Sequence, residues 1–394
     1  MEGGHSMKKV LLVAPLMTQS GYGVHSRQVA KWLLSKNNID LKIIPVPWGE
    51  TPWLLNRDSC DGLIGKIMEK TVPNNSVSDA DVSFQIQLPN EWNPNLAKKN
   101  IGITAGMETD VCNPSWINSC NKMDCVVVPS NHAKETFNRT GKIEKTVHVI
   151  PESYPDCLNS NEQSENINLN LPAENNFLIV SQLTGNNPFT DRKNVFFTIK
   201  WLCETFAGRQ DVGIVLKTNM GRNSSIDRKA VTNTLQQLLK EVRKEAYPKL
   251  HLIHGTMSDE EMKSLYKNPK IKALISLTRG EGYGLPLLEA AVTGLPIIAT
   301  GWSGHMDFLG KGRFISIDYK LENIHASRVD NNIFMQGSKW AAPSEEDFKK
   351  KVKKFLESPT VPQQWASELS SRLTQEYSHD SVCRQYDSCF GELF

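Results

Sequence analysis

Two carboxylates, three glycines and a helix start lie together in the segment TRGEGYGLPLLEAAVTGLPIIAT, residues 278–300. Gly280, Gly282 and Gly284 predict a turn whose backbone can closely approach a ligand. Pro286 suits the first turn of a helix, because proline lacks an N–H group that would be unpaired there. The unpaired N–H groups and the positive end of the helix dipole favour anions. The segment therefore predicts an anion site at a helix start.

Glu281 and Glu289 lie on either side of this helix start. Glu281 lies in the predicted turn, and Glu289 lies about one turn inside an apolar helix. A carboxylate among apolar residues needs hydrogen-bond partners, and sugar hydroxyls are suitable ones. The same spacing also suits two structural carboxylates, in which Glu289 complements the helix dipole and Glu281 is an exposed loop residue. The residues alone leave both interpretations open.

Short apolar strands alternate with helical patterns along most of the chain, which predicts parallel sheets with both faces covered. In the first half we expect strands at Val10–Met17, Leu41–Val46, Val82–Leu88, Ile101–Thr104, Cys125–Pro129 and Val147–Ile150. In the second half we expect them at Phe177–Ser181, Gly213–Lys217, Leu250–Ile253, Ala273–Leu277, Pro296–Thr300 and Phe314–Ile317.

The polar stretch Asp156–Asn176 separates the two halves and has the composition of a linker. We therefore expect an α/β protein with two doubly wound, Rossmann-like domains that face each other across a cleft, at residues 7–170 and 171–375. A helical pattern at Gln363–Phe394 ends the chain, and its last part, residues 376–394, is treated as a separate helix.

Composition excludes several classes of protein. With 394 residues the chain exceeds the ~250–300 residues of a single core. A net charge of +2 argues against a nucleic-acid partner, and no apolar run approaches the ~20 residues of a membrane span. The eight cysteines lack C-x₂-C spacing, which favours reduced thiols in the cytoplasm. The lysine run at residues 349–354 is typical of a solvated helix face, and contact with anionic lipid at the inner membrane face is the alternative.

Metal chemistry has one candidate motif. Asp79-Ala80-Asp81 has the D-x-D spacing of metal-dependent transferases, but it immediately precedes a predicted strand. This position favours a structural turn. The motif therefore does not predict a metal site.

The segment from Glu281 to Thr300 resembles the E-x₇-E signature of retaining glycosyltransferases with the two-domain GT-B architecture, specifically family 4. The resemblance implies that Glu289 binds the nucleotide ribose and that Glu281 contacts hydroxyls of the transferred sugar. It also implies that the backbone around Gly284 and Leu285 faces the diphosphate. Tyr283, between these groups, is a further expected donor contact.

Other segments extend the resemblance. Gly21-Tyr22-Gly23 is similar to the family's N-terminal glycine loop near the donor phosphates, although glycine turns after strands are also common in other proteins. Family members are typically metal-independent and use cations of the C-terminal domain instead. The resemblance thus implies neither a metal site nor a cofactor, and it implies this role for Lys193 and Arg192, with Lys217 as a further candidate. The last helix resembles one that crosses back to the N-terminal domain.

The sequence departs from the family at two places. Gln182 stands where many members have an arginine, and the charge of Arg192 or Lys217 would have to replace it. The stretch after the strand at Ile101–Thr104 lacks the histidine that many relatives have. Glu108 and Asp110 are the acceptor-side candidates there, without a choice between them.

Tryptophans in proline-rich loops of the N-terminal half offer apolar faces that suit sugar rings. Trp92 is the acceptor-side candidate among them, and Trp48 and Trp53 share its setting. Tryptophans in such loops also serve as hydrophobic anchors at a sheet edge. Both interpretations stay open.

These observations predict a retaining, metal-independent glycosyltransferase. It would move a hexose or N-acetylhexosamine from a UDP- or GDP-sugar to a hydroxyl of a carbohydrate or glycolipid acceptor. The alternatives are a sugar-nucleotide epimerase of the same architecture and a non-catalytic nucleotide-sugar-binding partner subunit. The donor base, the acceptor and the oligomeric state do not follow from the sequence.

Overall fold

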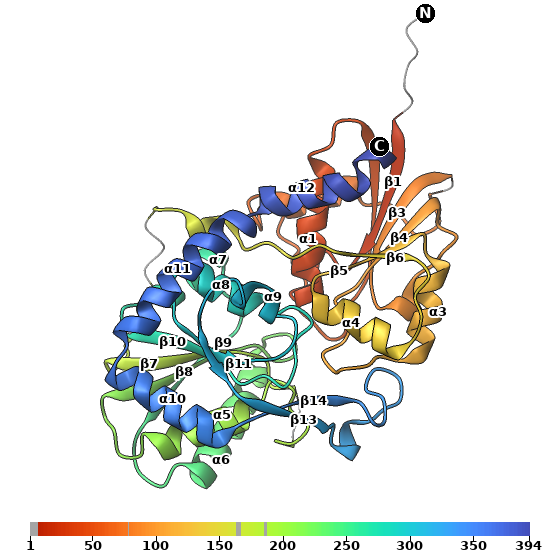
Figure 1. Ribbon diagram of the computed structural model, residues 1–394. Helices are drawn as coiled ribbons and strands as arrows, with labels where there is room; N and C mark the ends of the chain where they lie inside the picture. The colour runs from red at the N-terminus through yellow and green to blue at the C-terminus, as the bar shows by residue number, and fades with distance from the viewer. Residues whose placement is uncertain (1–6, 78, 163–166, 185–186) are drawn as a thin grey trace, which may run out of the picture. The chain divides into compact units, whose positions relative to one another are not determined.

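The computed structural model describes residues 7–77, 79–162, 167–184 and 187–394. These residues form two compact units. The first contains the chain up to Ser153 together with His379–Phe394, and the second contains Tyr154–Ser378. Each unit is built on a six-stranded sheet (Figure 1). The prediction of an α/β fold with two doubly wound, Rossmann-like domains is confirmed.

The first unit has a parallel sheet with the strand order β2-β1-β3-β4-β5-β6. Its apolar strands are buried on both faces, as expected for a parallel sheet covered by helices. The strands are β1 (Lys8–Ala14), β2 (Ile39–Pro45), β3 (Ala80–Ile86), β4 (Ala97–Ile103), β5 (Cys125–Val128) and β6 (Thr146–Val149). The helices are α1 (Gly21–Leu34), α2 (Leu63–Lys70), α3 (Pro114–Lys122), α4 (Asn131–Thr140) and α12 (His379–Phe390).

Helix α12 completes the core of the first unit although it comes from the far end of the chain. The Tyr386 ring lies 4.8 Å from that of Trp32 in α1, and the Phe390 ring lies 5.5 Å from that of Phe84 in β3. Trp32 Nε1 also donates a 2.8 Å hydrogen bond to Asp387. The predicted helical stretch Gln363–Phe394 is therefore two helices, because the chain breaks its helix after Glu376 before α12 begins.

The second unit has the strand order β12-β11-β10-β7-β8-β9, again parallel. The strands are β7 (Asn175–Val180), β8 (Val212–Thr218), β9 (Lys249–His254), β10 (Ile271–Ser276), β11 (Ile297–Thr300) and β12 (Ile315–Ile317). The helices are α5 (Val195–Thr205), α6 (Ser225–Val242), α7 (Asp259–Tyr266), α8 (Leu285–Val292), α9 (Met306–Leu309), α10 (Glu345–Glu357) and α11 (Thr360–Glu376).

A hairpin that the sequence analysis did not predict follows the last strand of this sheet. Strands β13 (Tyr319–Asn323) and β14 (Lys339–Pro343) pair antiparallel. In its second strand Trp340 and Ala341 are buried, whereas every residue of β13 is exposed. One side of the hairpin therefore packs on the unit.

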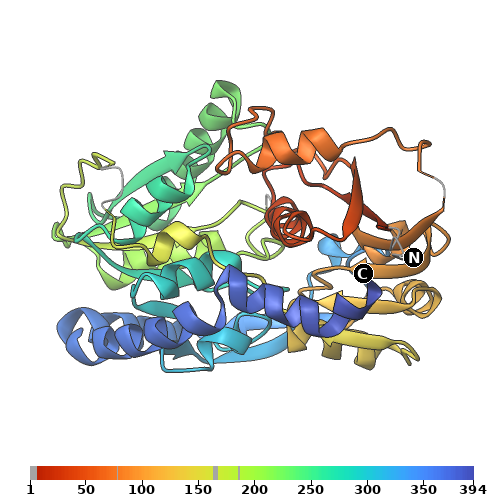
Figure 2. The same cartoon turned by 90° about the horizontal axis from the view of Figure 1, so that it is seen from above.

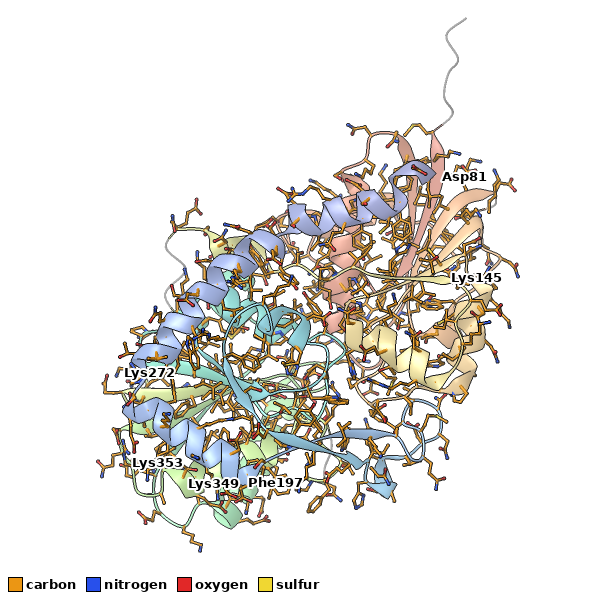
Figure 3. The ribbon with its side chains drawn as sticks, in the orientation of Figure 1. Asp81, Lys145, Phe197, Lys272, Lys349 and Lys353 are labelled. Atoms are coloured by element: carbon orange, nitrogen blue, oxygen red, sulfur yellow. The ribbon has the colours of Figure 1, made fainter. Side chains whose placement is uncertain are left out.

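Helices α10 and α11 pack on this unit through apolar stripes. Ser370 of α11 donates a 2.6 Å hydrogen bond to the carbonyl of Val292 in α8, and the two helices lie side by side (Figures 1 and 2). Lys349 of α10 pairs with Glu204 at 2.6 Å and with Glu345 at 2.7 Å. Figure 3 shows Lys349 and Lys353 at the surface of α10. No helix within the described residues is both long enough and apolar enough to cross a membrane.

The division between the units differs from the expected boundary at residues 170 and 171. Within the predicted linker, Leu158 and Leu171 are buried in the core of the second unit. The buried ammonium group of Lys263 donates to Ser160 Oγ at 2.8 Å and to the carbonyl of Glu162 at 3.0 Å. A few apolar anchors therefore attach this stretch to the second unit despite its polar composition.

Candidate functional site

The site is built at the carboxyl end of β10, where the chain turns into α8. Gly284 precedes the first residue of α8, Leu285, and has φ 94°. A Cβ atom at Gly284 would lie 3.0 Å from Cβ of His305, so both the backbone conformation and the space favour glycine. Pro286 lies in the first turn of the helix, as the sequence predicts.

Glu281 is buried in this turn and is surrounded by donors. Lys193 Nζ lies 2.6 Å from Oε1, and Thr278 Oγ1 donates to the same oxygen at 2.9 Å. Arg192 lies 3.3 Å from Oε2. Burial alone would raise the pKa of Glu281, but the charges of Lys193 and Arg192 outweigh it and lower the pKa to about 2. The carboxylate is therefore ionised at neutral pH.

The two cations come from the turn before α5, which is fixed at both of its ends. The Asp191 carboxylate accepts the first N–H of α5 at 2.8 Å. Asn194 has the left-handed φ of 56° and donates from its amide to the carbonyl of Leu277 at 3.0 Å. Between them, the guanidinium of Arg192 donates to the carbonyl of Gly280 at 2.7 Å. Side chains 88 positions apart in sequence thus meet.

Glu289 lies one turn inside α8 and is half-buried. The Tyr266 hydroxyl donates to its Oε2 at 3.1 Å. Burial, followed by the negative charge of Asp259, raises the pKa of Glu289 to about 8, although the hydrogen bond from Tyr266 and the charge of Lys217 act in the opposite direction. At pH 7 this carboxyl group is therefore mostly protonated, in contrast to Glu281.

Lys217, at the end of β8, is only 5% exposed. Its ammonium group donates to the carbonyl of Gly255 at 2.7 Å and to Oδ1 of Asn219 at 3.1 Å. Burial lowers its pKa to about 8. Neutral oxygens therefore hold this cation, and the nearby carboxyl groups of Glu261 and then Glu289 oppose the effect of burial on its pKa.

The remaining donor-side candidates of this unit have different environments. Tyr283 is buried, and its ring lies 5.3 Å from that of Phe308 in α9. Leu285 is half-buried. The Tyr283 side chain is thus part of the apolar packing beneath α8, and the backbone on either side of it forms the turn.

The glycine loop of the first unit forms the start of α1. Ser20 caps this helix by accepting the N–H of Gly23 at 3.0 Å. A Cβ atom at Gly23 would lie 2.0 Å from the carbonyl oxygen of Thr18, whereas one at Gly21 would meet no atom within 4 Å. Gly23 is therefore required by the packing of the chain on itself, and the space beside Gly21 is open.

The acceptor-side candidates also belong to the first unit. Glu108 and Asp110 are half-buried on the loop after β4. The Trp92 side chain is only 8% exposed and covers Gly102, where a Cβ atom would lie 2.7 Å from the ring. This packing is that of a hydrophobic anchor.

Two positions bear on metal binding and on the departure from the family. Asp81, labelled in Figure 3, accepts the N–H of Lys9 at 3.0 Å and pairs with Lys98 at 2.7 Å, as a structural residue does at a strand start. In the described ranges no group of three His, Cys, Asp or Glu side chains could hold a metal ion. Gln182 is exposed after β7, and the positive charges beside Glu281 come from Lys193 and Arg192.

Sequence reasoning missed residues that build the site from below. His305 is completely buried, with Nε2 2.6 Å from the carbonyl of Thr300 and Nδ1 3.5 Å from Ser303 Oγ. Ser303 Oγ also accepts the N–H of Glu281 at 2.8 Å. Arg279, two residues before Glu281, is buried as well. A charged residue between an apolar strand and a glycine turn is the signal that could have identified Arg279.

One protein-family model matches part of the second unit. Residues 232–372, which include Glu281 and Glu289, match the family model described as Glycosyl transferases group 1. A search among curated protein sequences finds no match.

Three solved structures are similar to almost the whole chain. A sucrose-phosphate synthase from Thermosynechococcus elongatus has 13% sequence identity and a TM-score of 0.64, with 98% of this chain and 99% of that chain covered. A glycosyltransferase from Rickettsia africae has 14% identity and a TM-score of 0.65, with 99% of each chain covered. The Anabaena protein HepE in complex with UDP and glucose has 12% identity and a TM-score of 0.57, with 98% of this chain and 99% of that chain covered. Identities this low show the fold. The chain thus has the GT-B fold, and its segment 232–372 matches the model of the glycosyltransferase group 1 family.

Proposed function

We propose that the protein is a retaining, metal-independent glycosyltransferase. It moves a hexose or N-acetylhexosamine from a UDP- or GDP-sugar to a hydroxyl of a carbohydrate or glycolipid. The observation that carries this proposal is the ionised Glu281 carboxylate, held by Lys193 and Arg192 beside the start of α8. The match of residues 232–372 to a glycosyltransferase family supports it.

The two cations suit a nucleoside diphosphate leaving group. Negative charge develops on the diphosphate as the bond to the sugar breaks, and fixed positive groups lower the barrier to that step. Lys193 and Arg192 would supply this charge, together with the N–H groups at the start of α8. In this proposal they take the place of a divalent metal ion.

The two glutamates differ in protonation, and this difference suits different partners. An ionised carboxylate such as Glu281 only accepts hydrogen bonds, so it can orient sugar hydroxyls. Glu289 is expected to bind the ribose hydroxyls of the nucleotide. A solved neighbour with the same fold binds UDP and glucose, which supports UDP as one of the two candidate nucleotides.

Retention of configuration follows from the resemblance of the Glu281–Glu289 segment to retaining enzymes. In such a reaction the acceptor hydroxyl attacks the face of the sugar from which the diphosphate leaves, and the departing phosphate takes the hydroxyl proton. No side chain has to form a covalent bond to the sugar. Exclusion of water from the closed site would limit hydrolysis of the donor.

Calorimetry with UDP, GDP and ADP in EDTA tests the proposal directly. We expect one nucleotide to bind to the wild type, and Glu289→Ala to weaken its binding by about 1–3 kcal/mol, or about 5- to 150-fold in Kd. Glu368→Ala, on the exposed face of α11, is the matched control and should bind like the wild type. Binding that requires Mg²⁺ and is unaffected by Glu289→Ala would contradict the metal-independent site.

Product analysis separates the proposed activity from its alternatives. The wild type is incubated with the nucleotide sugar that binds, alone and with a panel of carbohydrate and glycolipid acceptors. A glycosyltransferase forms a new glycoside only in the presence of an acceptor, and the product keeps the anomeric configuration of the donor. Conversion of the donor alone would indicate an epimerase, and binding without turnover would indicate a partner subunit.

A further inference from the structure

Arg279 carries a buried positive charge next to the site. It lies between β10 and Glu281 and is only 5% exposed. Its Cζ lies 6.0 Å from the ring of Phe197 in α5 and 5.8 Å from the ring of Trp340 in β14. Contacts of this kind stabilise a guanidinium in a partly desolvated place.

The polar contacts of Arg279 reach both ends of the turn that carries the two cations. Its Nε donates to the carbonyl of Asp191 at 3.3 Å, and its Nη2 donates to Asn194 Oδ1 at 3.3 Å. Its backbone N–H donates to the carbonyl of Arg192 at 2.8 Å. The Arg279 side chain is therefore hydrogen-bonded to the residues on both sides of Arg192 and Lys193 in the sequence.

The hairpin holds Arg279 from the other direction. The N–H of Ala341 in β14 donates to the carbonyl of Arg279 at 2.8 Å. Glu322 of β13 lies 3.4 Å from the Arg279 guanidinium, and Trp340 covers it. The hairpin thus reaches the turn of residues 191–194 through one side chain.

Burial of this arginine is not explained by stability alone. Desolvation of a guanidinium is costly, and it lowers the pKa of Arg279. Contacts of 3.3–3.4 Å are long for charge-assisted hydrogen bonds and return only part of that cost. An apolar side chain of similar size between Phe197 and Trp340 would often be as stable or more so.

We propose that Arg279 is a positioning residue, which, together with the β13–β14 hairpin, fixes the turn 191–194 so that Lys193 and Arg192 face Glu281. The inference rests on the proposed function, because it assigns a role to the groups that would bind the donor diphosphate. It adds a residue outside the Glu281–Glu289 segment and gives the hairpin a role in donor binding.

Hydrogen exchange tests the positioning without any substrate. Arg279→Met keeps an apolar stem between the two rings, and Arg279→Lys keeps the charge without the planar fork. Arg328→Met is the control, because Arg328 also stacks on a ring, that of Phe334 at 4.1 Å, between β13 and β14. We expect the amides of residues 193–195 to exchange about tenfold or more faster in Arg279→Met, less so in Arg279→Lys, and as in the wild type in Arg328→Met.

Binding of inorganic pyrophosphate by calorimetry tests the consequence for the site. We expect Kd to rise about tenfold in Arg279→Met, a loss of about 1.4 kcal/mol, and to be partly restored in Arg279→Lys. In a Lys193→Met background the same substitution should change Kd by less, because Arg279 acts through the cations and not on the ligand. Equal effects in the two backgrounds would contradict the inference.

The outcomes separate the inference from the proposed function. Unchanged exchange at residues 193–195 in Arg279→Met, or faster exchange with unchanged pyrophosphate affinity, overturns the inference. If the wild type binds neither nucleotides nor pyrophosphate, the proposed function fails, and faster exchange confined to the Arg279 variants still supports positioning of the turn. If Arg279→Met does not fold, Arg279→Lys serves in both measurements.

Discussion

Replacement of Lys193 by Met tests the electrostatic account of the site most directly. The substitution keeps a long apolar stem but removes the ammonium group 2.6 Å from Glu281. The Glu281 carboxylate then stays buried with two of its three partners. Thr278 still donates at 2.9 Å, and Arg192 still lies at 3.3 Å.

The size of the destabilisation depends on which partners of the Glu281 carboxylate are lost and which remain. Removal of one partner of a buried ion pair costs about 3–5 kcal/mol. Because Arg192 remains near Glu281, we expect the lower end of that range, about 3 kcal/mol at pH 7. In domains of about 150–250 residues each kcal/mol changes Tm by about 2–4 °C, so the transition of the second unit should fall by about 6–12 °C.

The pH dependence of this effect has a definite sign. The pKa of Glu281 lies below its ordinary value in the folded protein, at about 2. Such a group contributes stability that is fully present above its unfolded pKa, about 4.5, and that disappears as the pH falls from there towards 2. The difference in stability between wild type and Lys193→Met should therefore be full at pH 7 and smaller at pH 4.

Thermal unfolding of a small set of variants provides the assay. Lys200→Met removes a half-exposed ion pair with Glu204 within α5, whose atoms lie 3.0 Å apart, and should cost less than about 1 kcal/mol. The double variant Lys193→Met/Glu281→Gln leaves no unpaired carboxylate and should recover most of the lost stability. If the double variant is no more stable than Lys193→Met, or if Lys200→Met is equally damaging, the reasoning is wrong.

Three further predictions concern other parts of the chain. Binding of the nucleotide to the wild type should tighten as the pH rises from 7 towards the pKa of Glu289, about 8, by up to about tenfold per pH unit, because the ionised carboxylate accepts hydrogen bonds from the ribose hydroxyls. Calorimetry should show a flatter pH dependence in Glu289→Gln, and an identical pH dependence would contradict the ribose role. Gly23→Ala should destabilise the first unit by about 1–3 kcal/mol in thermal unfolding, because the added Cβ would lie 2.0 Å from a carbonyl oxygen. Gly21→Ala should change stability by less than about 0.5 kcal/mol and weaken nucleotide binding. Similar unfolding of the two variants would refute this distinction. Phe390→Ala should destabilise the first unit by about 3–5 kcal/mol, measured by its melting temperature, while a drop confined to the second unit would show that α12 does not belong to the first core.

Sequence periodicity predicts the two sheets well because each strand is a short, continuous apolar run. The strand predicted at Val10–Met17 is an example, and it ends early, at Ala14, because Pro15 cannot continue the ladder. The helix after the glycine turn begins at Leu285 as expected. These features are local, so neighbouring residues are sufficient to predict them.

Contacts between distant segments are much harder to predict. Spacing alone left the environment of Glu281 open, and only the resemblance pointed to Arg192 and to Lys193, which lies 88 positions away. The sequence did not predict the roles of Arg279 and the β13–β14 hairpin, because these roles depend on tertiary contacts that the residue pattern of β13 does not indicate. The division after Ser153 escaped it as well, since a polar composition conceals the few buried anchors of the following stretch.

The contribution of α12 to the first core has a consequence for biosynthesis. A ribosome makes the chain from its N-terminus, so the six strands of the first unit emerge long before Tyr386 and Phe390, which pack against Trp32 and Phe84. The second unit, continuous from Tyr154 to Ser378, has all its residues available earlier. The nascent first unit therefore exposes the apolar side chains that α12 covers until α12 itself has been synthesised, and this is the interval in which we expect it to need protection from aggregation.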